Sequence, residues 1–544
     1  MDPTDLPRCG AFARPDGAVC WRVWAPRAGR VDLVLIDGAS RQTLPMTAEP
    51  NGYFSRTHAG ISEGRRYAYR LNGGPERPDP MTLWQPDGVH QPSAVLFPER
   101  FAWDENGWTG IPREDLVLYE LHVGTFTPER TFEAVISRLE ALRDLGVTAI
   151  ELMPVAQFPG GRNWGYDGVH PFAAQNTYGG PHGLQRLVNA CHARGLAVIL
   201  DVVYNHLGPE GNYLAEFGPY FTDRHRTPWG PALNFDDAGC DPVREFFLDN
   251  VRLWVGAYRM DGLRLDATHA IFDNSPRHIL RDIKEAGDAA ALPGRKTHVI
   301  AEHLRNDPRV LMSPERGGYG LDAEWNDDFH HAVHAFLTGE RQGYYVDFGD
   351  ARAFPKLFEK TFLLDGVYSQ FRSRRFGAPV GDLSGDRFAV SLQTHDQVGN
   401  RAGSGRLASL LRPPALRLAA SMLLLAPHLP LLFMGEEYGE ENPFWFFCSF
   451  LDRHLGERVR AGRRREYAEH MKGADIADPQ AEATFAASRL SWSWPEGTPR
   501  AGLRRLYGDL LAVRRRWPAL SDYVHRSARL LPDEGNPWVC LLYT

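Results

Sequence analysis

The chain has 544 residues, of which 43% are hydrophobic and 24% are charged, and its formal net charge is −7. This length allows several domains and a large core, and the composition is that of an ordinary globular protein. The small net charge, without a long run of one sign, argues against nucleic acid or an anionic membrane as a partner and fits a neutral substrate.

The cysteines and the apolar runs indicate in which cellular compartment the protein is expected. Six cysteines are scattered through the chain without a CxxC pair, which favours free thiols in a reducing environment. The N-terminus has no apolar signal segment, and the longest apolar run, 419–434, is interrupted by Pro427, His428 and Pro430. We therefore expect a cytoplasmic protein that does not cross a membrane.

Residues 1–100 read as short strands separated by glycines, the pattern of an immunoglobulin-like or carbohydrate-module-like β-sandwich. In the segment RRYAYRLN, at 65–72, Tyr67, Tyr69 and Leu71 share one face. Segments 20–24 and 30–36 have the same character, and residues 97–112 are expected to form a linker.

From residue 116 on, strand-like and helical segments alternate, which predicts a parallel sheet covered by helices. Helices are expected at 131–145, 183–193 and 243–258, with Gly146 and Gly195 at their C-caps. Eight strand-like runs would close a (β/α)₈ barrel, at 116–123, 147–153, 196–204, 262–267, 298–303, 320–325, 389–395 and 430–434.

The predicted fold class is therefore α/β, a (β/α)₈ TIM barrel over 112–518 preceded by the β-sandwich. Inserted loops are expected near 207–240 and 437–500. Residues 519–544 read as the start of a short C-terminal β domain, and the chain stops at VCLLYT in what looks like a strand.

Charged side chains follow four of the predicted strands, and the C-terminal ends of barrel strands meet at one mouth. In GLRLDA, at 262–267, Arg264 and Asp266 alternate with leucines, so the two charges point to the same face. The other ends are DVVYNH at 201–206, HVIAE at 298–302 and THDQ at 394–397. Carboxylates this close repel one another, so chemistry explains them better than packing or unrelated surface acids do.

These four segments resemble the signature segments of the α-amylase superfamily, and the resemblance covers about 112–518. Three further stretches, NYL…YFTDRHRTPWGPALNFD, EWNDDFHHAVHAFLTGERQGYYVDF and QTHDQVGNRA, are similar to the malto-oligosyltrehalose trehalohydrolase branch. The resemblance implies a retaining glycoside hydrolase that cleaves the α-1,4 bond next to a terminal trehalose unit and releases trehalose. Its substrate would be malto-oligosyltrehalose or a related α-glucan, with no cofactor and no required metal.

Residue roles follow from the same resemblance. Asp266 resembles the nucleophile, Glu302 the general acid/base and Asp396 the third carboxylate, which orients the sugar. Arg264 would keep Asp266 ionised and oriented. The expected substrate-binding residues are Tyr166, Asp201, His206, Arg264, His395, Trp325, Asn326, Asp327, Asp328 and His330. Of Asp327 and Asp328, one is expected to cap the next helix and the other to reach the trehalose end.

Two alternatives remain open at this point. An α-glucan branching transferase would use the same barrel and the same three carboxylates, although the EWNDDFHH stretch favours the hydrolase. A glucan-binding protein with an inactive barrel is disfavoured by the intact carboxylates. One departure from the family concerns specificity, because His303-Leu304-Arg305-Asn306 follows Glu302 where a short polar pair is usual.

Overall fold

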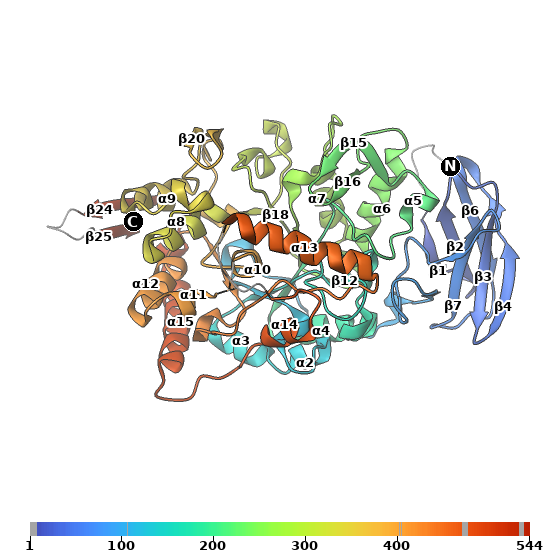
Figure 1. The fold of residues 1–544 in the computed structure, drawn as a ribbon, viewed down its shortest axis with the longest axis horizontal. Helices are drawn as coiled ribbons and strands as arrows, with labels where there is room; N and C mark the ends of the chain where they lie inside the picture. The colour runs from blue at the N-terminus through green and yellow to red at the C-terminus, as the bar shows by residue number, and fades with distance from the viewer. Residues whose placement is uncertain are drawn as a thin grey trace.

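The computed structural model describes residues 8–105, 107–401, 403, 405–470, 477–531 and 538–543. The N-terminal strands lie at one end of the long axis and the last strand pair lies at the other (Figure 1). Between them, eight parallel strands close a barrel in the order β10-β11-β14-β17-β18-β19-β22-β23. The predicted fold class is confirmed.

Two antiparallel sheets form the N-terminal region. One contains β1 (Gly10–Ala13), β2 (Val19–Trp24), β6 (Tyr53–His58) and β5 (Thr47–Ala48). The other contains β4 (Ser40–Pro45), β3 (Val31–Asp37), β7 (Arg66–Leu71) and β8 (Glu76–Arg77), with β9 (Ser93–Ala94) beside β7. Tyr67 and Tyr69 point to the same side, as the alternation predicts, and the Tyr67 hydroxyl donates to buried Asp79 at 2.8 Å. The sheets thus pack through large aromatic side chains.

Each barrel strand coincides with a strand predicted from the sequence. The bounds are β10 (Leu118–Leu121), β11 (Ala149–Leu152), β14 (Ala197–Val202), β17 (Gly262–Leu265), β18 (His298–Glu302), β19 (Ala323–Asn326), β22 (Phe388–Ser391) and β23 (Leu429–Phe433). The barrel closes where Leu118 of β10 pairs with Leu431 of β23.

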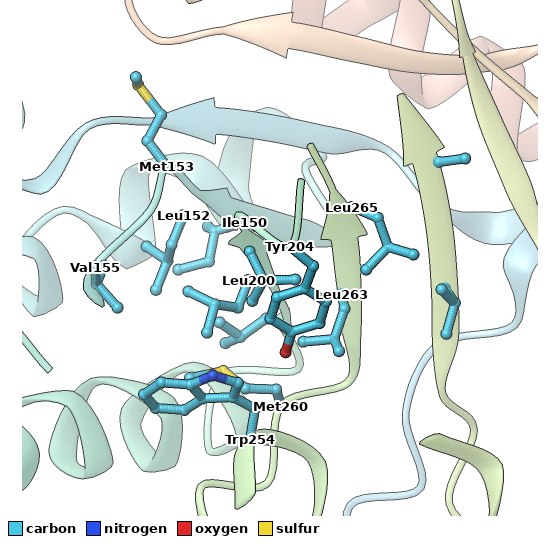
Figure 2. Close-up of a cluster of buried hydrophobic side chains, with 14 of the residues drawn as sticks. Ile150, Leu152, Met153, Val155, Leu200, Tyr204, Trp254, Met260, Leu263 and Leu265 are labelled. Atoms are coloured by element: carbon cyan, nitrogen blue, oxygen red, sulfur yellow. The ribbon is translucent and has the colours of Figure 1, made fainter. Parts of the chain in front are cut away.

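Alternation along these strands separates two apolar regions. Leu118, Ala149, Ile199, Ile300 and Leu431 belong to a cluster inside the barrel. The intervening side chains face the surrounding helices, and Figure 2 shows Ile150, Leu152, Leu200, Leu263 and Leu265 on that side, near Trp254. By the same parity, Glu120, Asp201, Arg264 and Glu302 point inward, toward the barrel axis.

The predicted helix at 131–145 is wrong as a single helix. It is divided into α2 (Phe132–Ile136) and α3 (Leu139–Leu145). The Ser137 hydroxyl donates to the Ala134 carbonyl at 2.7 Å, and such a bond competes with the next helical turn. Gly146 ends α3 at φ 110°, as the C-cap prediction requires.

The predicted helix at 243–258 begins earlier, as α6 (Cys240–Arg252), and ends in a π-helical turn, η5 (Leu253–Ala257). Its apolar face includes one polar residue, Asn250, which is fully buried and whose side chain has hydrogen-bond partners. The Asn250 side chain accepts from the Tyr204 hydroxyl at 2.6 Å and donates to the Pro171 carbonyl at 2.9 Å. The helix is thereby attached to the barrel wall by specific bonds as well as by apolar contacts.

The remaining helices cover the barrel or belong to its insertions. The barrel helices include α4 (Gly180–His192), α7 (Ile279–Ala290), α8 (Asp327–Thr338), α12 (Pro413–Leu424) and α15 (Pro499–Arg516). The loop 207–240 carries α5 (Leu214–Phe217) and the hairpin β15 (Phe221–Thr227) and β16 (Gly230–Leu233). The segment 437–500 carries α13 (Arg453–His470) and α14 (Glu482–Ala487).

Other short elements are α1 (Val123–Phe126), β12 (Ala156–Gln157), β13 (His170–Ala174), α9 (Phe354–Lys360), β20 (Val367–Ser369), β21 (Arg374–Phe376), α10 (His395–Gly399) and α11 (Leu407–Leu410). The strands β24 (Arg526–Leu531) and β25 (Trp538–Tyr543) form an antiparallel pair after the barrel. Among the described residues, no helix is long and apolar enough to cross a membrane.

Candidate active site

Arg264 is at the centre of the charged groups at the barrel mouth. Its side chain is fully buried, and Nη1 donates to Asp201 Oδ2 at 2.8 Å and to Asp266 Oδ1 at 2.9 Å. Nη2 donates to Glu302 Oε2 at 2.8 Å. Asp266 and Glu302 therefore occupy neighbouring nitrogens of one guanidinium, and their carboxylates face the same small space.

The guanidinium of Arg264 also lies over the Trp325 ring, 4.2 Å from its centroid. Burial alone would lower the pKa of Arg264, but the Asp201 and Glu302 carboxylates outweigh burial and raise it. The group is therefore a permanent cation, and Trp325 covers the face that would otherwise lack contacts.

Asp266 is held at both carboxylate oxygens. Besides Arg264 on Oδ1, Asn205 Nδ2 donates to Oδ2 at 2.7 Å and to the Asp266 carbonyl at 2.8 Å. Hydrogen bonds of this kind favour the ionised carboxylate and fix its orientation. Asn205 was not among the predicted site residues. Its position in DVVYNH, directly before His206, was the available signal.

Glu302 ends β18 and is fastened to the turn after Asp266. The backbone N–H of Ala267 donates to Glu302 Oε2 at 2.8 Å, and the Thr268 hydroxyl donates to the Glu302 carbonyl at 2.8 Å. Ala267 has φ 39° and ψ 51°, a left-handed conformation that is costly for a residue with a Cβ. The strained turn therefore links the Glu302 carboxylate by a hydrogen bond to the residue that directly follows Asp266.

Asp201 and Tyr166 form the side of the site next to Arg264. The Tyr166 hydroxyl donates to Asp201 Oδ2 at 2.6 Å. Burial raises the pKa of Asp201 to about 7, against the lowering effect of Arg264. The Tyr166 ring stacks on His395 with centroids 5.0 Å apart, so the predicted aromatic platform and the predicted sugar-contacting histidine are in contact.

His395 and Asp396 follow β22. The His395 backbone N–H donates to Glu120 Oε2 at 3.0 Å, its ring Nδ1 bonds to Glu120 Oε1, and its Nε2 lies 3.5 Å from Asp396 Oδ1. The Asp396 side chain is 45% exposed at the mouth. Desolvation raises the pKa of Asp396, the His395 cation opposes this rise, and the Glu302 carboxylate adds to it. Glu120, on β10, was not predicted.

His206 lies at the rim of the same mouth. Its Nδ1 is bonded to Asn205 Oδ1, its Nε2 lies 3.0 Å from the Tyr166 carbonyl, and its ring stacks on Trp229 with centroids 4.7 Å apart. Trp229 belongs to the β15–β16 hairpin and is 51% exposed. An exposed indole beside the site suits contact with the face of a sugar ring. The sequence alone could not indicate Trp229, because nothing local links the hairpin to His206.

Three predicted substrate-binding residues have other partners in the structure. The Asn326 side chain caps α8 by accepting from the Phe329 N–H at 3.0 Å, so the expectation that an aspartate caps this helix is wrong. Asp328 accepts from the N–H groups of Leu363 and Leu364, at 2.7 and 3.0 Å.

His330 is buried between the Leu392 carbonyl and the Tyr345 hydroxyl, which use both ring nitrogens. Together with Asn326 and Asp328, it is therefore bonded to the scaffold around the mouth, and the substrate-binding role of these three side chains stays a prediction.

Asp327 is the member of that run that faces the mouth. It is only partly buried, and Gln397 Nε2 donates to its Oδ1 at 3.3 Å. Burial, followed by the Glu302 and Asp396 carboxylates, raises the pKa of Asp327 to about 7. Within the described part of the chain, no group of three or more His, Cys, Asp or Glu side chains is arranged to hold a metal ion.

Comparison with known proteins agrees with this geometry. The family model for the alpha amylase catalytic domain matches residues 95–229, and that for carbohydrate-binding module 48, the isoamylase N-terminal domain, matches residues 9–82. A crystal structure assigned as an alpha amylase, from Salmonella typhimurium, superposes with a TM-score of 0.90 at 38% identity. It covers 97% of this chain and 90% of that one.

Two curated relatives match over nearly their whole length. The malto-oligosyltrehalose trehalohydrolase of Saccharolobus solfataricus is 48% identical over 96% of this chain and 89% of its own length. The enzyme of the same name from Arthrobacter ramosus is 46% identical over 91% of this chain and 87% of its own length. The chain is thus a glycoside hydrolase of the α-amylase type and belongs to the malto-oligosyltrehalose trehalohydrolase family.

Proposed function

We propose that this enzyme hydrolyses the α-1,4-glucosidic bond next to the terminal trehalose of malto-oligosyltrehalose and releases trehalose. The observation that supports this most is the arrangement of Asp266 and Glu302 on one guanidinium, in a chain of this family. A carbohydrate-binding module ahead of the barrel further supports an α-glucan as the substrate.

Asp266 is the nucleophile in this proposal. Arg264 and Asn205 hold both of its oxygens, which fixes the orientation of the carboxylate. It attacks the anomeric carbon and forms a covalent glycosyl intermediate. The shared guanidinium keeps Glu302 near enough to act on the same glycosidic bond, as the short carboxyl separation of retaining enzymes requires.

Glu302 is the general acid and then the general base. Of the hydrogen bonds that the described residues make to this carboxylate, both fall on Oε2, from Arg264 and Ala267. The other oxygen, Oε1, is therefore the one suited to deliver a proton to the leaving sugar and later to take one from water. No cofactor is needed, because the only electrophile in this scheme is a proton.

The sugar ring at the cleaved bond would be held by the groups around these two carboxylates. Asp396 is the exposed third carboxylate, His395 would donate to a sugar hydroxyl, and Tyr166 offers an aromatic face. His206, whose ring nitrogens are bonded to Asn205 Oδ1 and to the Tyr166 carbonyl, would line the sugar site beside Trp229. Asp201 orients Tyr166 and Arg264. These roles are assigned from position and chemistry together.

Recognition of the trehalose end requires polar groups, because trehalose has no reducing end. Asp327 is partly exposed beside Asp396 and is our candidate for a bond to the second glucose. A polar group that substrate would cover disfavours a ligand that leaves it unpaired. Among the described residues, Cys20, Cys191, Cys240 and Cys448 form no disulfide, which supports a reducing compartment, and we propose that the enzyme works in the cytoplasm.

The decisive experiment is to follow hydrolysis of maltotriosyl-trehalose by proton NMR during the first minutes. We expect free trehalose and maltotriose whose new reducing end starts as the α-anomer, since two displacements retain configuration. Initial β-anomer would contradict the double displacement. Release of glucose or maltose without trehalose would contradict the substrate.

A parallel incubation with amylose, followed by iodine staining and counting of α-1,6 linkages, examines the branching alternative. The proposed hydrolase forms no new α-1,6 linkage. Efficient formation of such linkages would assign the chain to the transferase reaction, because a sugar hydroxyl would then resolve the same glycosyl intermediate in place of water.

A further inference from the structure

Two glutamates lie side by side beneath the candidate site. Glu120 on β10 pairs in register with Glu151 on β11, and both point into the barrel. Each side chain is 1% exposed. The two residues are therefore of the same type, are equally buried and lie on adjacent strands. They differ in their partners, and this difference indicates a difference in charge.

Glu120 is fully engaged by His395. One oxygen accepts from the His395 backbone N–H at 3.0 Å and the other is bonded to ring Nδ1. The opposite ring nitrogen, Nε2, lies 3.5 Å from Asp396 Oδ1. The imidazole lies between two carboxyl groups, and a proton on each ring nitrogen lets it donate toward both. The geometry thus favours an imidazolium, with Nε2–H on the side of Asp396.

Glu151 has no such engagement. Among the described residues, neither of its carboxyl oxygens has a hydrogen-bond partner. Burial, followed by the neighbouring Glu120 carboxylate, raises the pKa of Glu151. A carboxyl group without partners in a dry layer is neutral, because a charge there would be uncompensated. The two glutamates of this pair therefore differ in kind: Glu151 is neutral, whereas Glu120 is bonded to His395 through both of its oxygens.

We propose that Glu120 is a positioning residue that keeps His395 in the imidazolium form and aims its Nε2–H at a hydroxyl of the bound sugar, while neighbouring Glu151 remains neutral. The substrate part of this inference rests on the proposed function, whereas the charge state of His395 does not. The consequence is a charged donor at the sugar, which bonds more strongly than a neutral one.

The other charged and titratable groups around His395 are consistent with this charge state. Arg264 on β17 opposes a second cation, whereas Glu120 and Asp396 favour it. His122, after β10, is uncharged near neutral pH, because burial lowers its pKa to about 4. Burial lowers the pKa of His395, but the Glu120 and Asp396 carboxylates outweigh burial and raise it to about 9. The His395 ring is therefore cationic at neutral pH and loses its proton as the pH rises through about 9.

The direct test needs no substrate. The full chain is labelled with ¹⁵N-histidine, and the His395 ring signals are assigned by their loss in His395→Asn. We expect both ring nitrogens to be protonated at pH 7.5 in the wild type and to titrate near pH 9. A wild-type His395 that is neutral at pH 7.5 overturns the proposal, and this outcome does not depend on whether any variant folds.

Three variants then locate the counter-ion. Glu120→Gln should lower the midpoint of the His395 titration by more than two pH units, and Glu120→Asp, which keeps the charge, should retain most of the elevation. Glu151→Gln is the matched control, and its His395 titration should remain that of the wild type. An unchanged midpoint in Glu120→Gln, or an equal shift in Glu151→Gln, would overturn the assignment of Glu120.

Activity provides the functional readout. With α-maltotriosyl fluoride, whose departure needs little proton donation, the falling alkaline limb of kcat/KM should follow His395 in the wild type. Glu120→Gln should move that limb to lower pH and reduce kcat/KM at pH 7.5 by about 10- to 100-fold, the value of a charged hydrogen bond. Failure to release trehalose would contradict the proposed substrate but would leave the titration result intact.

Discussion

The backbone N–H of Ala267 donates a 2.8 Å hydrogen bond to Oε2 of Glu302. Ala267 makes this contact in the left-handed region, which costs a residue with a side chain about 1–2 kcal/mol. The turn comes directly after Asp266. The backbone at Ala267 therefore fixes the position of the Glu302 carboxylate relative to that of Asp266. The backbone strain lies at the residue that sets the spacing between these two candidate catalytic groups.

Substitution at Ala267 examines this turn. Ala267→Gly should change stability by less than about 1 kcal/mol, because relief of strain and the extra freedom of the unfolded chain offset each other. Ala267→Val places a β-branched residue at positive φ and should destabilise the fold by about 1–3 kcal/mol. It should also lower kcat by roughly tenfold or more through displacement of Glu302. Melting temperature and kcat are the measurements, and equal behaviour of the two variants would show that the turn is unimportant.

Asp266→Asn should preserve the fold, since the substitution is nearly isosteric, and should lower kcat by about 10³-fold or more because the nucleophile is removed. The matched control is Asp386→Asn at the opposite end of the barrel, where Asp386 pairs with Arg113. That variant should lose stability but keep its kcat. Retention of more than about a tenth of wild-type kcat in Asp266→Asn would require another nucleophile.

Glu302→Gln should distinguish a proton donor from a purely structural carboxyl. Hydrolysis of malto-oligosyltrehalose should fall by about 10²- to 10⁴-fold, because its sugar leaving group must be protonated. An activated aryl glycoside, whose leaving group needs little protonation, should lose far less in the first step. Both substrates are measured by single-turnover kinetics. Equal losses on the two substrates would mean that Glu302 acts only by holding Arg264 and Ala267 in position.

The barrel could be predicted from the sequence because its signals are local. The strands are short runs rich in apolar residues, and charged side chains follow four of them. The parity that puts Leu263 outside also puts Arg264 inside. The helix at 131–145 was wrong for an equally local reason. Its apolar stripe continues through Ser137, but the hydroxyl of that residue bonds to the previous turn and ends it.

The parts of the site that could not be predicted depend on contacts between distant segments. The bond between Asn205 and Asp266 joins the ends of two strands that are far apart in the sequence, β14 and β17. The bond between His395 and Glu120 joins segments that meet only when β23 closes the barrel between β22 and β10. Trp229 reaches His206 from an inserted hairpin that no periodicity constrains. The cap of α8 was misplaced because β19 extends to Asn326, one residue beyond the predicted strand.

The neighbouring aspartates at the start of α8 should differ in their effects. Asp328→Ala leaves the N–H groups of Leu363 and Leu364 without an acceptor and removes one of the two bonds of the Asn306 amide, and should cost about 3 kcal/mol or more of stability. At about pH 4, where the folded and unfolded chains both hold the Asp327 proton, Asp327→Ala should hardly change the melting temperature. It should lower the preference for malto-oligosyltrehalose over maltodextrin, measured as a ratio of kcat/KM, by roughly tenfold. Similar destabilisation by both changes, with an unaltered ratio, would give Asp327 a structural role only.

Asp327 also makes stability depend on pH in a direction that can be stated in advance. Its pKa is raised from the ordinary value of 3.8 to about 7, by burial first and by the Glu302 and Asp396 carboxylates next. Below about pH 4 the folded and unfolded chains both hold the proton, so the group costs nothing. Between about pH 4 and 7 the unfolded chain releases the proton first and is favoured, so the folded state loses stability as the pH rises.

Asp327→Asn removes this titration. The melting temperature of the variant relative to the wild type should therefore increase from pH 4.5 to pH 7.5 and then level off. The corresponding gain in the free energy of unfolding should be at most about 2–4 kcal/mol, because the side chain is partly exposed and solvent screens part of the effect. Calorimetric scans of both proteins at several pH values provide the measurement. Asp350→Asn, at an exposed aspartate whose pKa is lowered by bonds to Arg352, is the control and should show no such increase. If the melting temperature of Asp327→Asn relative to the wild type instead increased as the pH fell, the folded protein would be stabilising Asp327 as an anion. The Asp327 carboxylate would then be a hydrogen-bonded partner of Gln397 rather than a destabilising group at the sugar site.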